Sequence, residues 1–436
     1  MSAKSSRSAV TRGVQMSAIV VASVLALTAC GGGGGGEGGS TAEPSSGGVP
    51  YGASKAEYQA AFEDIDPITL ITQTAGAPGN VTSEYFEAYQ DAITDWSGGK
   101  ITFETNYAYS IAPPTEVSAA IADGRLDMSY TIPAYHPEEL PTANALIDMS
   151  ISGQQTPLVG YLQLMGWSVE LSLASEEIRS EFERMDLYPL LPVYSLGPDV
   201  FTCAEPRSDL AELQGATARM GARLHAEQLG ALGVQGVSMS LAEIYEALQR
   251  GVIDCTVINP LTASITGTIE IAPNARYVPE TGFSGGVGAL VINNDLFASL
   301  PLPARQLLHD RLDVFVEAQI ASVQGAFLEL VTATEEHGGT VEVFEQDVRD
   351  ALAEVNADII EASKTSLTGV ADPGAFVDTS EAAMKRWYDI VVDLGYDPEI
   401  TYDDFAQWQA AQPADVFGPF LDALFGGDVL SASRPS

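Results

Sequence analysis

The sequence predicts an α/β protein built from two lobes, each with a mixed, mostly parallel sheet flanked by helices, and with a long helix crossing both lobes. Three observations support this fold class. Strand-like apolar segments alternate with amphipathic helical segments near the start of the globular body, and the same alternation recurs over residues 209–260. A helical apolar stripe then runs over residues 303–337, which is longer than an average globular helix.

The first lobe opens with a strand–helix–strand pattern that is typical of parallel sheets. An apolar strand follows Asp66-Pro67, and a second strand follows the turn at Gly98-Gly99. A helix closed by Gly124 leads to a third strand, and a longer helical stretch leads to a fourth. The predicted segments are strands 68–76, 101–108, 126–131 and 187–194 and helices 83–97, 115–123 and 158–185.

The second lobe follows Gly197-Pro198 and contains a βαβαβ unit. Its predicted segments are strands 216–220, 234–239 and 252–258 and helices 224–232 and 241–250. The first of these strands carries Arg219 among apolar residues. A guanidinium is always charged and forks toward two oxygen atoms, so Arg219 either pairs with an internal acid or binds an anionic ligand. The second interpretation makes the sharper functional prediction.

The rest of the chain adds one strand to the first lobe and further helices. The predicted segments are strands 287–293 and 340–344, helices 303–337, 347–364 and 380–394, and a final packing element after Tyr402 with Trp408 and residues 417–425. We assign residues 66–196 and 286–324 to the first lobe, 197–285 and 325–425 to the second, and 426–436 to a tail. Because α/β sheets bind ligands at the carboxyl ends of their strands, we expect a binding cleft between the lobes.

The N-terminus has the features of an export signal. A positively charged start precedes an apolar segment, residues 17–29, which is too short to span a bilayer. The tetrapeptide LTAC that ends at Cys30 resembles a bacterial lipobox, whose cysteine carries lipid. We therefore expect a lipoprotein signal peptide over residues 1–29, a lipid anchor at Cys30, and a flexible Gly/Ser-rich linker over residues 30–65 outside the cytoplasmic membrane.

The three cysteines divide between two expected roles. With Cys30 assigned to lipid, Cys203 and Cys255 remain. In an oxidising, extracytoplasmic compartment two remaining cysteines favour a disulfide over a metal site. Two free buried thiols are the alternative, because the sequence does not show how far apart the two Cα atoms lie.

The charge balance is strongly acidic. Aspartate and glutamate together number 59 against 20 lysines and arginines, so the formal net charge is −39. This excludes nucleic acid as an expected partner, and the dispersed acids predict a solvated surface. A field of this sign repels an anion at long range, so an anionic ligand needs a local arginine in a cleft.

Residues 209–254 resemble the substrate-binding subunits of tripartite ATP-independent periplasmic (TRAP) transporters, the DctP-like receptors. The matching pattern is D-L-x-x-L-x-G-x-x-x-R, then L-G-A-L-G-V, then S-L-A-E-I-Y-E-A-L-Q-R-G-V-I-D. The first lobe also resembles the family. The matching residues are S-G-G-K-I at 97–101, Glu116, and A-D-G-R-L-D-M at 122–128. Asn293 and the L-P pair at 300–301 also fit, and the resemblance covers roughly residues 67–319.

The resemblance implies a two-lobe fold of the type II periplasmic-binding-protein kind and a receptor that passes a small organic carboxylate to the membrane subunits of a TRAP permease. It implies no ATP hydrolysis. In this family the arginine at the position of Arg219 makes a bidentate salt bridge to the ligand carboxylate. Asn259 is similar to a ligand-contacting asparagine, although its spacing from Asp254 is one residue longer. Glu116 matches a glutamate near the cleft; a structural role at Arg219 or at a helix N-terminus is the alternative.

One departure from the family concerns the segment between the lobes. Many members carry a second ligand arginine shortly after a glycine there, where this chain has Gly197-Pro198-Asp199. An acid at this place argues against a second ligand carboxylate. Aromatic side chains are candidates for apolar pocket walls, with ordinary core packing as the alternative for each. They are Tyr130, Tyr135, Trp167 and Phe201.

Other classes of protein are less well supported by the sequence. Residues 282–286 match G-x-S-x-G, but a strand rather than a helix is predicted after them, which disfavours an exported α/β hydrolase. The four histidines lack metal-ligand spacing, so no metal or other cofactor is expected. A carboxylate pair for glycoside hydrolysis stays open, because so acidic a chain has many paired acids. An ABC-type solute receptor would have the same two-lobe architecture, but the sequence motifs do not match that class.

Overall fold

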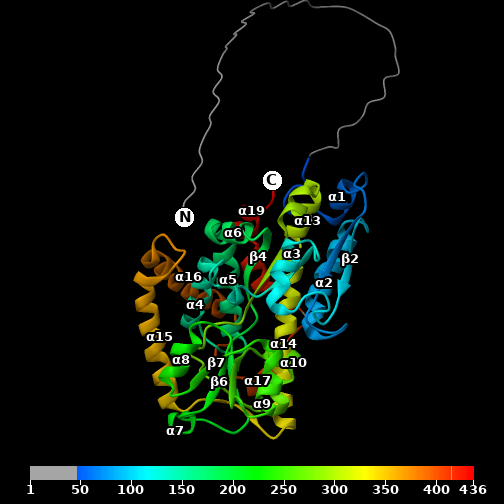
Figure 1. Ribbon diagram of the computed structural model, residues 1–436. Coiled ribbons are helices and arrows are strands. Elements are labelled where there is room, and N and C mark those ends of the chain that lie inside the picture. The colour runs from blue at the N-terminus through cyan, green and yellow to red at the C-terminus, as the bar shows by residue number, and fades with distance from the viewer. Residues whose placement is uncertain (1–46, 414) are drawn as a thin grey trace, which may run out of the picture. The chain divides into compact units, whose positions relative to one another are not determined.

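The computed structural model describes residues 47–413 and 415–436 (Figure 1). The predicted signal peptide, Cys30 and the first part of the predicted linker lie outside the described residues. The linker prediction is wrong at its C-terminal end, because residues Lys55–Ala61 form helix α1. Ser54 and Glu57 cap this helix reciprocally, with the Ser54 side chain accepting from the Glu57 backbone N–H. The folded body therefore begins before residue 66.

The first sheet has the strand order β2-β1-β3-β10-β4. Its strands are β1 (Ile68–Gln73), β2 (Ile101–Asn106), β3 (Met128–Thr131), β4 (Leu187–Ser195) and β10 (Val287–Asn293). β1 pairs in parallel with β2 and β3, whereas β10 runs antiparallel to both β3 and β4. The predicted strand 287–293 is thus an interior strand of the first sheet, between β3 and β4.

Helices and short 3-10 turns connect the strands of this sheet and pack against it. They are α2 (Val81–Trp96), α3 (Val117–Ala122), α4 (Pro141–Asp148), α5 (Val159–Ala174), α6 (Glu176–Glu183) and α12 (Asn294–Ser299), with short 3-10 turns η1 (Pro114–Glu116), η2 (Pro133–Tyr135) and η3 (Met149–Ser152). The helical stretch predicted over 158–185 is two helices, because Ser175 leaves helical geometry and caps α6 by accepting from the Ile178 N–H.

The second sheet has the order β11-β9-β5-β8-β6-β7. Its strands are β5 (Val200–Cys203), β6 (Thr217–Met220), β7 (Gln235–Ser238), β8 (Cys255–Ile258), β9 (Asn274–Tyr277) and β11 (Thr340–Val343). Three pairings are parallel (β6 with β7, β6 with β8, β9 with β11), and β5 runs antiparallel to β8 and β9. The predicted βαβαβ unit is confirmed, whereas β5 and β9 are additional strands.

The helices of the second lobe are short except for one. They are α7 (Leu210–Leu213), α8 (His225–Ala231), η4 (Leu241–Glu243), α9 (Ile244–Gln249), α10 (Pro260–Thr266), α11 (Thr268–Ile271) and α15 (Gln346–Ser366). α8 packs against β6, β7 and α15. A separate hydrophobic core built around Phe201, Leu229 and Leu352 lies wholly within this lobe. The larger core fills the first lobe and continues to α9 and α10.

The predicted long helix crosses both lobes but is broken into α13 (Leu302–Asp310) and α14 (Leu312–Glu336). α14 packs against α2 in the first lobe and against α10 and β11 in the second (Figure 1). At the break, the Arg311 guanidinium lies 3.8 Å from the centroid of the Trp96 ring. Residues 302–336 are long and apolar enough to span a membrane, but 56% of the most apolar window is buried within the protein, as in a core helix.

The C-terminal helices do not follow the predicted division into lobes. They are α16 (Pro373–Asp393), α17 (Tyr402–Ala410), α18 (Gly418–Phe425) and α19 (Asp428–Ser433). α16 was expected in the second lobe, yet it packs along α5 beside the first sheet. A Cβ at Gly166 would lie 2.3 Å from the Trp387 ring, and Trp167 Nε1 donates to Ser380 Oγ at 3.2 Å. The predicted tail also joins the first lobe, because Arg434 binds both carboxylate oxygens of Asp310.

Cys203 and Cys255 form a disulfide that joins β5 to β8. The two residues face each other in the antiparallel register, with their Cα atoms 4.0 Å apart. Both residues are buried in the core of the second lobe. The alternative of two free thiols is therefore not what the structure contains.

Candidate functional site

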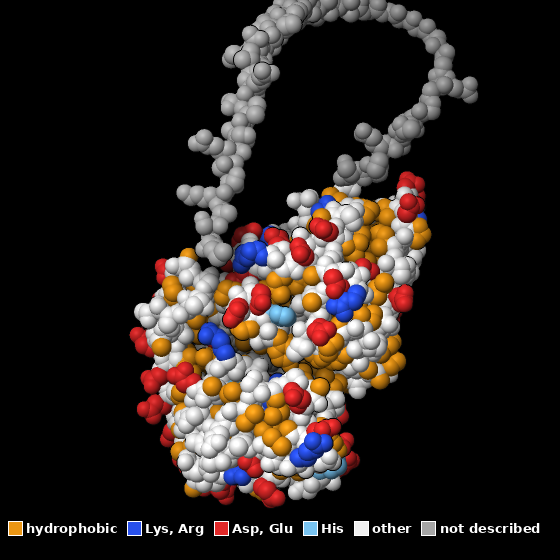
Figure 2. Space-filling model, in the orientation of Figure 1, with side chains coloured by type: hydrophobic (Ala, Val, Ile, Leu, Met, Phe, Trp, Pro, Cys, Tyr) orange, Lys and Arg blue, Asp and Glu red, His pale blue; other side chains and the backbone are white. Residues whose placement is uncertain are grey.

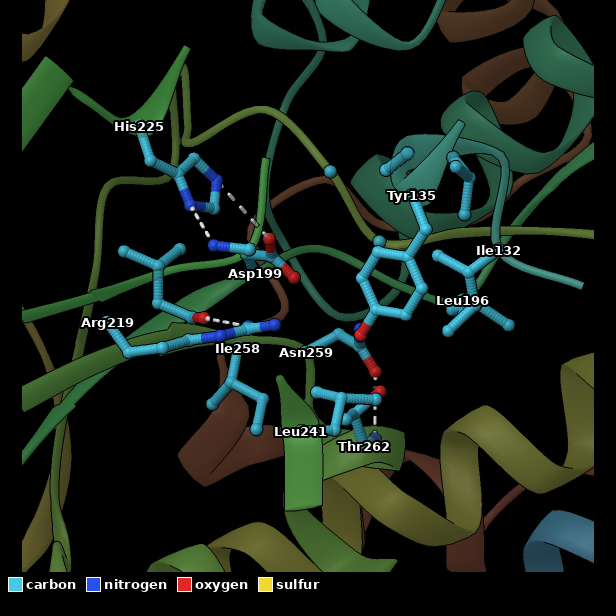
Figure 3. Close-up of a pocket in the computed structure, with 16 residues that line it drawn as sticks. Ile132, Tyr135, Leu196, Asp199, Arg219, His225, Leu241, Ile258, Asn259 and Thr262 are labelled. Atoms are coloured by element: carbon cyan, nitrogen blue, oxygen red, sulfur yellow. Dashed lines mark hydrogen bonds and ion pairs between the residues drawn. The ribbon is translucent and has the colours of Figure 1, made fainter. Parts of the chain in front are cut away.

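A pocket lies where two of the chain crossings between the sheets meet. One crossing leads from β4 to β5, and the other leads from β9 to β10; the Leu196 N–H donates to the Gly286 carbonyl and ties them together. Residues from both lobes line the pocket: Ile132, Ala134, Tyr135, Leu196, Asp199, Arg219, Gly221, His225, Leu241, Val257, Ile258, Asn259, Thr262, Gly285, Gly286 and Val287 (Figure 3). The carboxyl ends of β6 and β8 point into it, as expected for an α/β sheet.

Arg219 provides the positive charge of this pocket. It lies on β6 and is only 4% exposed, and its guanidinium extends from the strand into the pocket (Figure 3). Nε donates to the Met239 carbonyl at 3.4 Å and Nη1 to the Val257 carbonyl at 3.3 Å. Among the described residues, no carboxylate oxygen lies within 4.0 Å of it. Two of its five N–H donors are thus used by carbonyl groups, and the cation has no close counter-ion.

Burial acts on the charge of Arg219. Desolvation lowers the pKa of its guanidinium, and nearby Tyr135 and Asp199 raise that pKa. An arginine stays protonated despite such a shift, so the pocket contains a permanent, poorly hydrated cation. Gly221 makes room for it, because a Cβ at that position would lie 2.4 Å from Arg219 Nη1.

Tyr135 and Asn259 approach the same space from opposite lobes. Tyr135 ends η2 in the first lobe, and its hydroxyl interacts with Arg219 and with the Leu241 backbone. Asn259 precedes α10, and its Oδ1 accepts from the Thr262 N–H at 2.9 Å. This hydrogen bond assigns the oxygen of the amide and leaves the amide nitrogen as a donor toward the pocket.

Asp199 is the second ionisable group of the pocket. It is 7% exposed, and its Oδ1 has no hydrogen-bond partner among the described residues. Desolvation raises the pKa of its carboxyl to about 7, although Arg219 and a hydrogen bond from Asn259 act in the opposite direction. Gly285 permits the close approach of the loop, since a Cβ there would lie 2.8 Å from Asp199 Oδ2 and the residue has φ +138°.

His225 supports the pocket from behind. Its Nδ1 accepts from the Gly221 N–H at 3.0 Å, so its Nε2 carries the proton and donates to the Ser284 carbonyl. Desolvation lowers its pKa to about 4, with the Ser284 hydrogen bond opposing and Arg219 adding to the shift. His225 is therefore neutral at pH 7 and holds the loops at Gly221 and Ser284 in place.

The structure brings together some of the predicted site residues and separates others. Arg219, Tyr135 and Asn259 line one pocket. Glu116 does not: it is exposed at the N-terminus of α3, where its charge suits the helix dipole. Phe201 does not line the pocket either, because it is fully buried and stacks on Phe283 in the core of the second lobe.

Two further aromatic candidates also serve the core. Tyr130 packs against Tyr109 in the first lobe, and Trp167 is bound to α16 through Ser380. Sequence reasoning missed His225 and Gly285 as pocket residues. Neither had a local sequence pattern that indicates a pocket residue, because both take their roles from contacts between distant loops.

Asp199 was noticed as a departure from the family pattern, and the structure places it in the pocket.

The arrangement suits ligand binding better than covalent catalysis. Ser284, the serine of the G-x-S-x-G string, is fully buried; its Oγ has no hydrogen-bond partner in the described part of the chain, and His225 binds its carbonyl instead. The residues after it lead into strand β10, as predicted, so there is no strand-to-helix elbow here. A buried cation facing apolar walls between two α/β lobes is the arrangement expected of a solute-binding receptor.

Comparison with known proteins agrees with this class. The sequence matches bacterial extracellular solute-binding protein family 7 (DctP) over residues 72–365, which is more than half of the chain. The protein therefore belongs to this family of extracytoplasmic receptors.

Solved structures share the fold. A marine-metagenome TRAP solute-binding protein specific for aromatic acids, in complex with 3-hydroxybenzoate, has a TM-score of 0.62 at 16% identity and covers 74% of this chain and 99% of its own. A TRAP solute-binding protein from Rhodoferax ferrireducens with benzoate gives 0.62 at 20% identity, with 74% and 99% coverage. The ectoine-binding protein of a Halomonas elongata TRAP transporter gives 0.62 at 18%, with 73% and 99% coverage.

Proposed function

We propose that this protein binds a small organic carboxylate between its lobes and delivers it to the membrane subunits of a TRAP permease. The observation that carries the proposal is Arg219. Its guanidinium is buried, permanently charged and faces the pocket, and no carboxylate oxygen of the described residues lies within 4.0 Å of it. A ligand carboxylate supplies the missing counter-charge through a forked, charge-assisted pair of hydrogen bonds. The Asn259 amide is placed to donate a further hydrogen bond.

The walls of the pocket define the rest of the ligand. Ile132, Leu196, Leu241, Ile258 and Val287 present apolar surface around the polar groups. A carboxylate with a compact apolar body fits this mixture. The 3-hydroxybenzoate and benzoate receptors with the same fold support a ligand of this kind.

The binding cycle follows from the two-lobed construction. Tyr135 belongs to the first lobe and Arg219 to the second, so closure brings both onto the bound ligand and removes water from the salt bridge. Reopening releases the ligand to the permease. We also propose that lipid on Cys30 and the segment after it tether the receptor to the membrane surface, which keeps it close to that permease.

The family match favours a TRAP partner over an ABC-type one. It also favours a binding protein over an exported hydrolase, in agreement with the buried Ser284.

A thermal-shift screen tests the proposal, because a ligand that binds only the folded state raises the melting temperature. Small carboxylates are compared with their neutral primary amides, for example benzoate with benzamide. We expect stabilisation by one or more carboxylates and none by the matching amides, since an amide cannot neutralise Arg219. Equal stabilisation by both members of each pair would show that the pocket does not select a carboxylate.

A further inference from the structure

Asp199 brings an acid into a pocket that is built around a cation. It follows Gly197-Pro198 and directly precedes β5, so its side chain projects from the crossing between the lobes. Figure 3 shows its carboxylate beside the Arg219 guanidinium, with Tyr135 and Asn259 across the pocket. Both Asp199 and Arg219 are more than nine-tenths buried, yet they form no ion pair within 4.0 Å.

The protein leaves part of this carboxylate unsatisfied. Oδ1 is buried and has no hydrogen-bond partner among the described residues. Oδ2 lies 4.0 Å from His225 Nε2, but the proton on that nitrogen is directed to the Ser284 carbonyl. Among the described residues, the side chain that donates to Asp199 and lowers the pKa of its carboxyl is the Asn259 amide. Buried acceptors without a donor are costly, so an unsatisfied oxygen at a pocket wall indicates a group that a ligand satisfies.

The charge balance of the pocket points in the same direction. The facing ionisable groups are Arg219 from β6, neutral His225 from α8, and Tyr135 from η2. When Asp199 is ionised, a ligand that carries a carboxylate and nothing else places a second negative charge next to it. A donor on the ligand removes this conflict, because an O–H or N–H bound to Asp199 offsets the repulsion.

On this basis, and resting on the proposed function, we propose that the ligand is a carboxylate that also carries a hydrogen-bond donor, with its carboxylate on Arg219 and its O–H or N–H on Asp199 Oδ1. Asp199 then selects the ligand rather than merely excluding a second carboxylate. The donor is a hydroxyl, an amide N–H or an ammonium, and all three make the same contact with an acceptor oxygen.

The test is isothermal titration of the full-length receptor with matched pairs of carboxylates. The pairs are mandelate with phenylacetate, pyroglutamate with cyclopentanecarboxylate, and 3-hydroxybenzoate with benzoate. In each pair only the first member has the donor. We expect the donor-bearing member of the best-binding pair to bind at least about tenfold more tightly than its partner. Comparing hydroxyl with N–H members shows which donor the pocket prefers.

Two variants locate the effect at Asp199. Asp199→Leu keeps a side chain of similar size but has no acceptor, and we expect the two members of the pair to bind within about threefold of each other. Asp199→Asn keeps an acceptor oxygen, and we expect it to retain part of the discrimination. If Asp199→Leu fails to fold, the affinity difference within each pair, measured for the wild type and for Asp199→Asn, still tests the role of Asp199.

The outcomes separate this inference from the proposed function. Carboxylates that bind with equal affinity with and without the donor overturn the role of Asp199 and leave the receptor function intact. Discrimination that persists unchanged in Asp199→Leu also overturns it. Failure of every carboxylate in the panel to bind would contradict the proposed function itself.

Discussion

At the scale of single residues, the pocket holds a buried guanidinium and a buried carboxyl group that form no ion pair within 4.0 Å. Burial lowers the pKa of Arg219 and raises that of Asp199, because the charged form of each side chain loses its hydration in the folded protein. Such groups are retained at binding sites because a ligand restores the interactions that water would have made. The cost to the ligand-free protein is measurable through its dependence on pH.

Asp199→Asn should therefore stabilise the protein above about pH 7 and have little effect near pH 4. An unfolded chain ionises Asp199 near the ordinary value of 3.8, whereas the folded protein holds it protonated up to about 7. Between these values the folded state binds more protons, so the free energy of unfolding falls with rising pH by about 1.4 kcal/mol per unit. The asparagine variant lacks this loss. Melting temperatures of both proteins between pH 4 and pH 8 measure the difference.

A matched control for this experiment is Asp91→Asn, which changes an exposed aspartate on α2. Its melting profile should follow that of the wild type. If Asp199→Asn also followed the wild-type profile at every pH, the carboxyl of Asp199 would not be desolvated in the folded protein.

From the sequence, Arg219 was placed correctly in this site, whereas Phe201 and Glu116 were not. Arg219 was recognisable because a charged residue in an apolar strand needs a counter-ion. The family resemblance supported Asn259 less directly, and Tyr135 was only one of four aromatic candidates for an apolar wall. Phe201 was misplaced because all four residues of β5 are buried, so the strand has no polar face from which its side-chain directions can be inferred. Glu116 was misplaced because a residue that opens a helix faces solvent as readily as a cleft.

At the scale of elements, the cross-strand disulfide should contribute to stability without touching the ligand. Cys203 and Cys255 close a loop with a sequence separation of 52 residues, and constraining that loop in the unfolded chain is worth about 2–4 kcal/mol. The double variant Cys203→Ser/Cys255→Ser should lose about this much in chemical unfolding. Its affinity for the ligand should stay within about twofold of wild type, since neither cysteine lines the pocket.

Two measurements complete the disulfide test. Intact mass after alkylation without reduction should show neither cysteine modified, and alkylation after reduction should show both. A double variant as stable as the oxidised wild type would contradict the predicted contribution of the bridge.

The elements themselves show which sequence signals decide a boundary. The start of α16 was predicted seven residues too late, although Asp372 as the cap and Pro373 at the first helical position are a recognisable start signal. The break between α13 and α14 had no local signal. It is stabilised by distant parts of the chain, because Arg311 lies over Trp96 while Asp310 is bound by Tyr58 and Arg434. β9 was not predicted, although it is no shorter than β6, β7 and β8, which were.

At the scale of the whole protein, an ion pair spans the two lobes next to the pocket. Arg223 follows β6 in the second lobe and binds Asp148 at the end of α4 in the first. Asp148 is 3% exposed in its side chain, whereas Arg223 is 48% exposed and does not line the pocket. On the face that Figure 2 shows, acidic side chains are scattered over both lobes. This pair is thus a specific attraction across the cleft.

Arg223→Met should therefore favour the open form. It leaves the Asp148 carboxylate buried and unpaired when the lobes are closed, whereas opening exposes that carboxylate to water. Because the arginine is half exposed, we expect ligand affinity to fall by about threefold to tenfold. Titration calorimetry measures the affinity, and small-angle scattering of the ligand-free protein should show a larger radius of gyration.

Arg349→Met is the matched control, because Arg349 pairs with Glu280 on the second-lobe side, away from the pocket. It should change neither the affinity nor the radius of gyration. The same loss of affinity in both variants would mean that charge removal in general, and not the pair between the lobes, controls closure.

The central claim is that Arg219 is the anchor for a ligand carboxylate, and titration calorimetry of Arg219→Met tests it most directly. Methionine fills much of the same volume but leaves the carbonyl groups of Met239 and Val257 without the Arg219 donors, so the ligand-free melting temperature is measured first to show that the variant folds. With the best-binding carboxylate from the screen, we predict a loss of affinity of about 100-fold or more, because a forked, charge-assisted contact disappears. A folded variant that binds the same carboxylate within about threefold of the wild type would contradict the account.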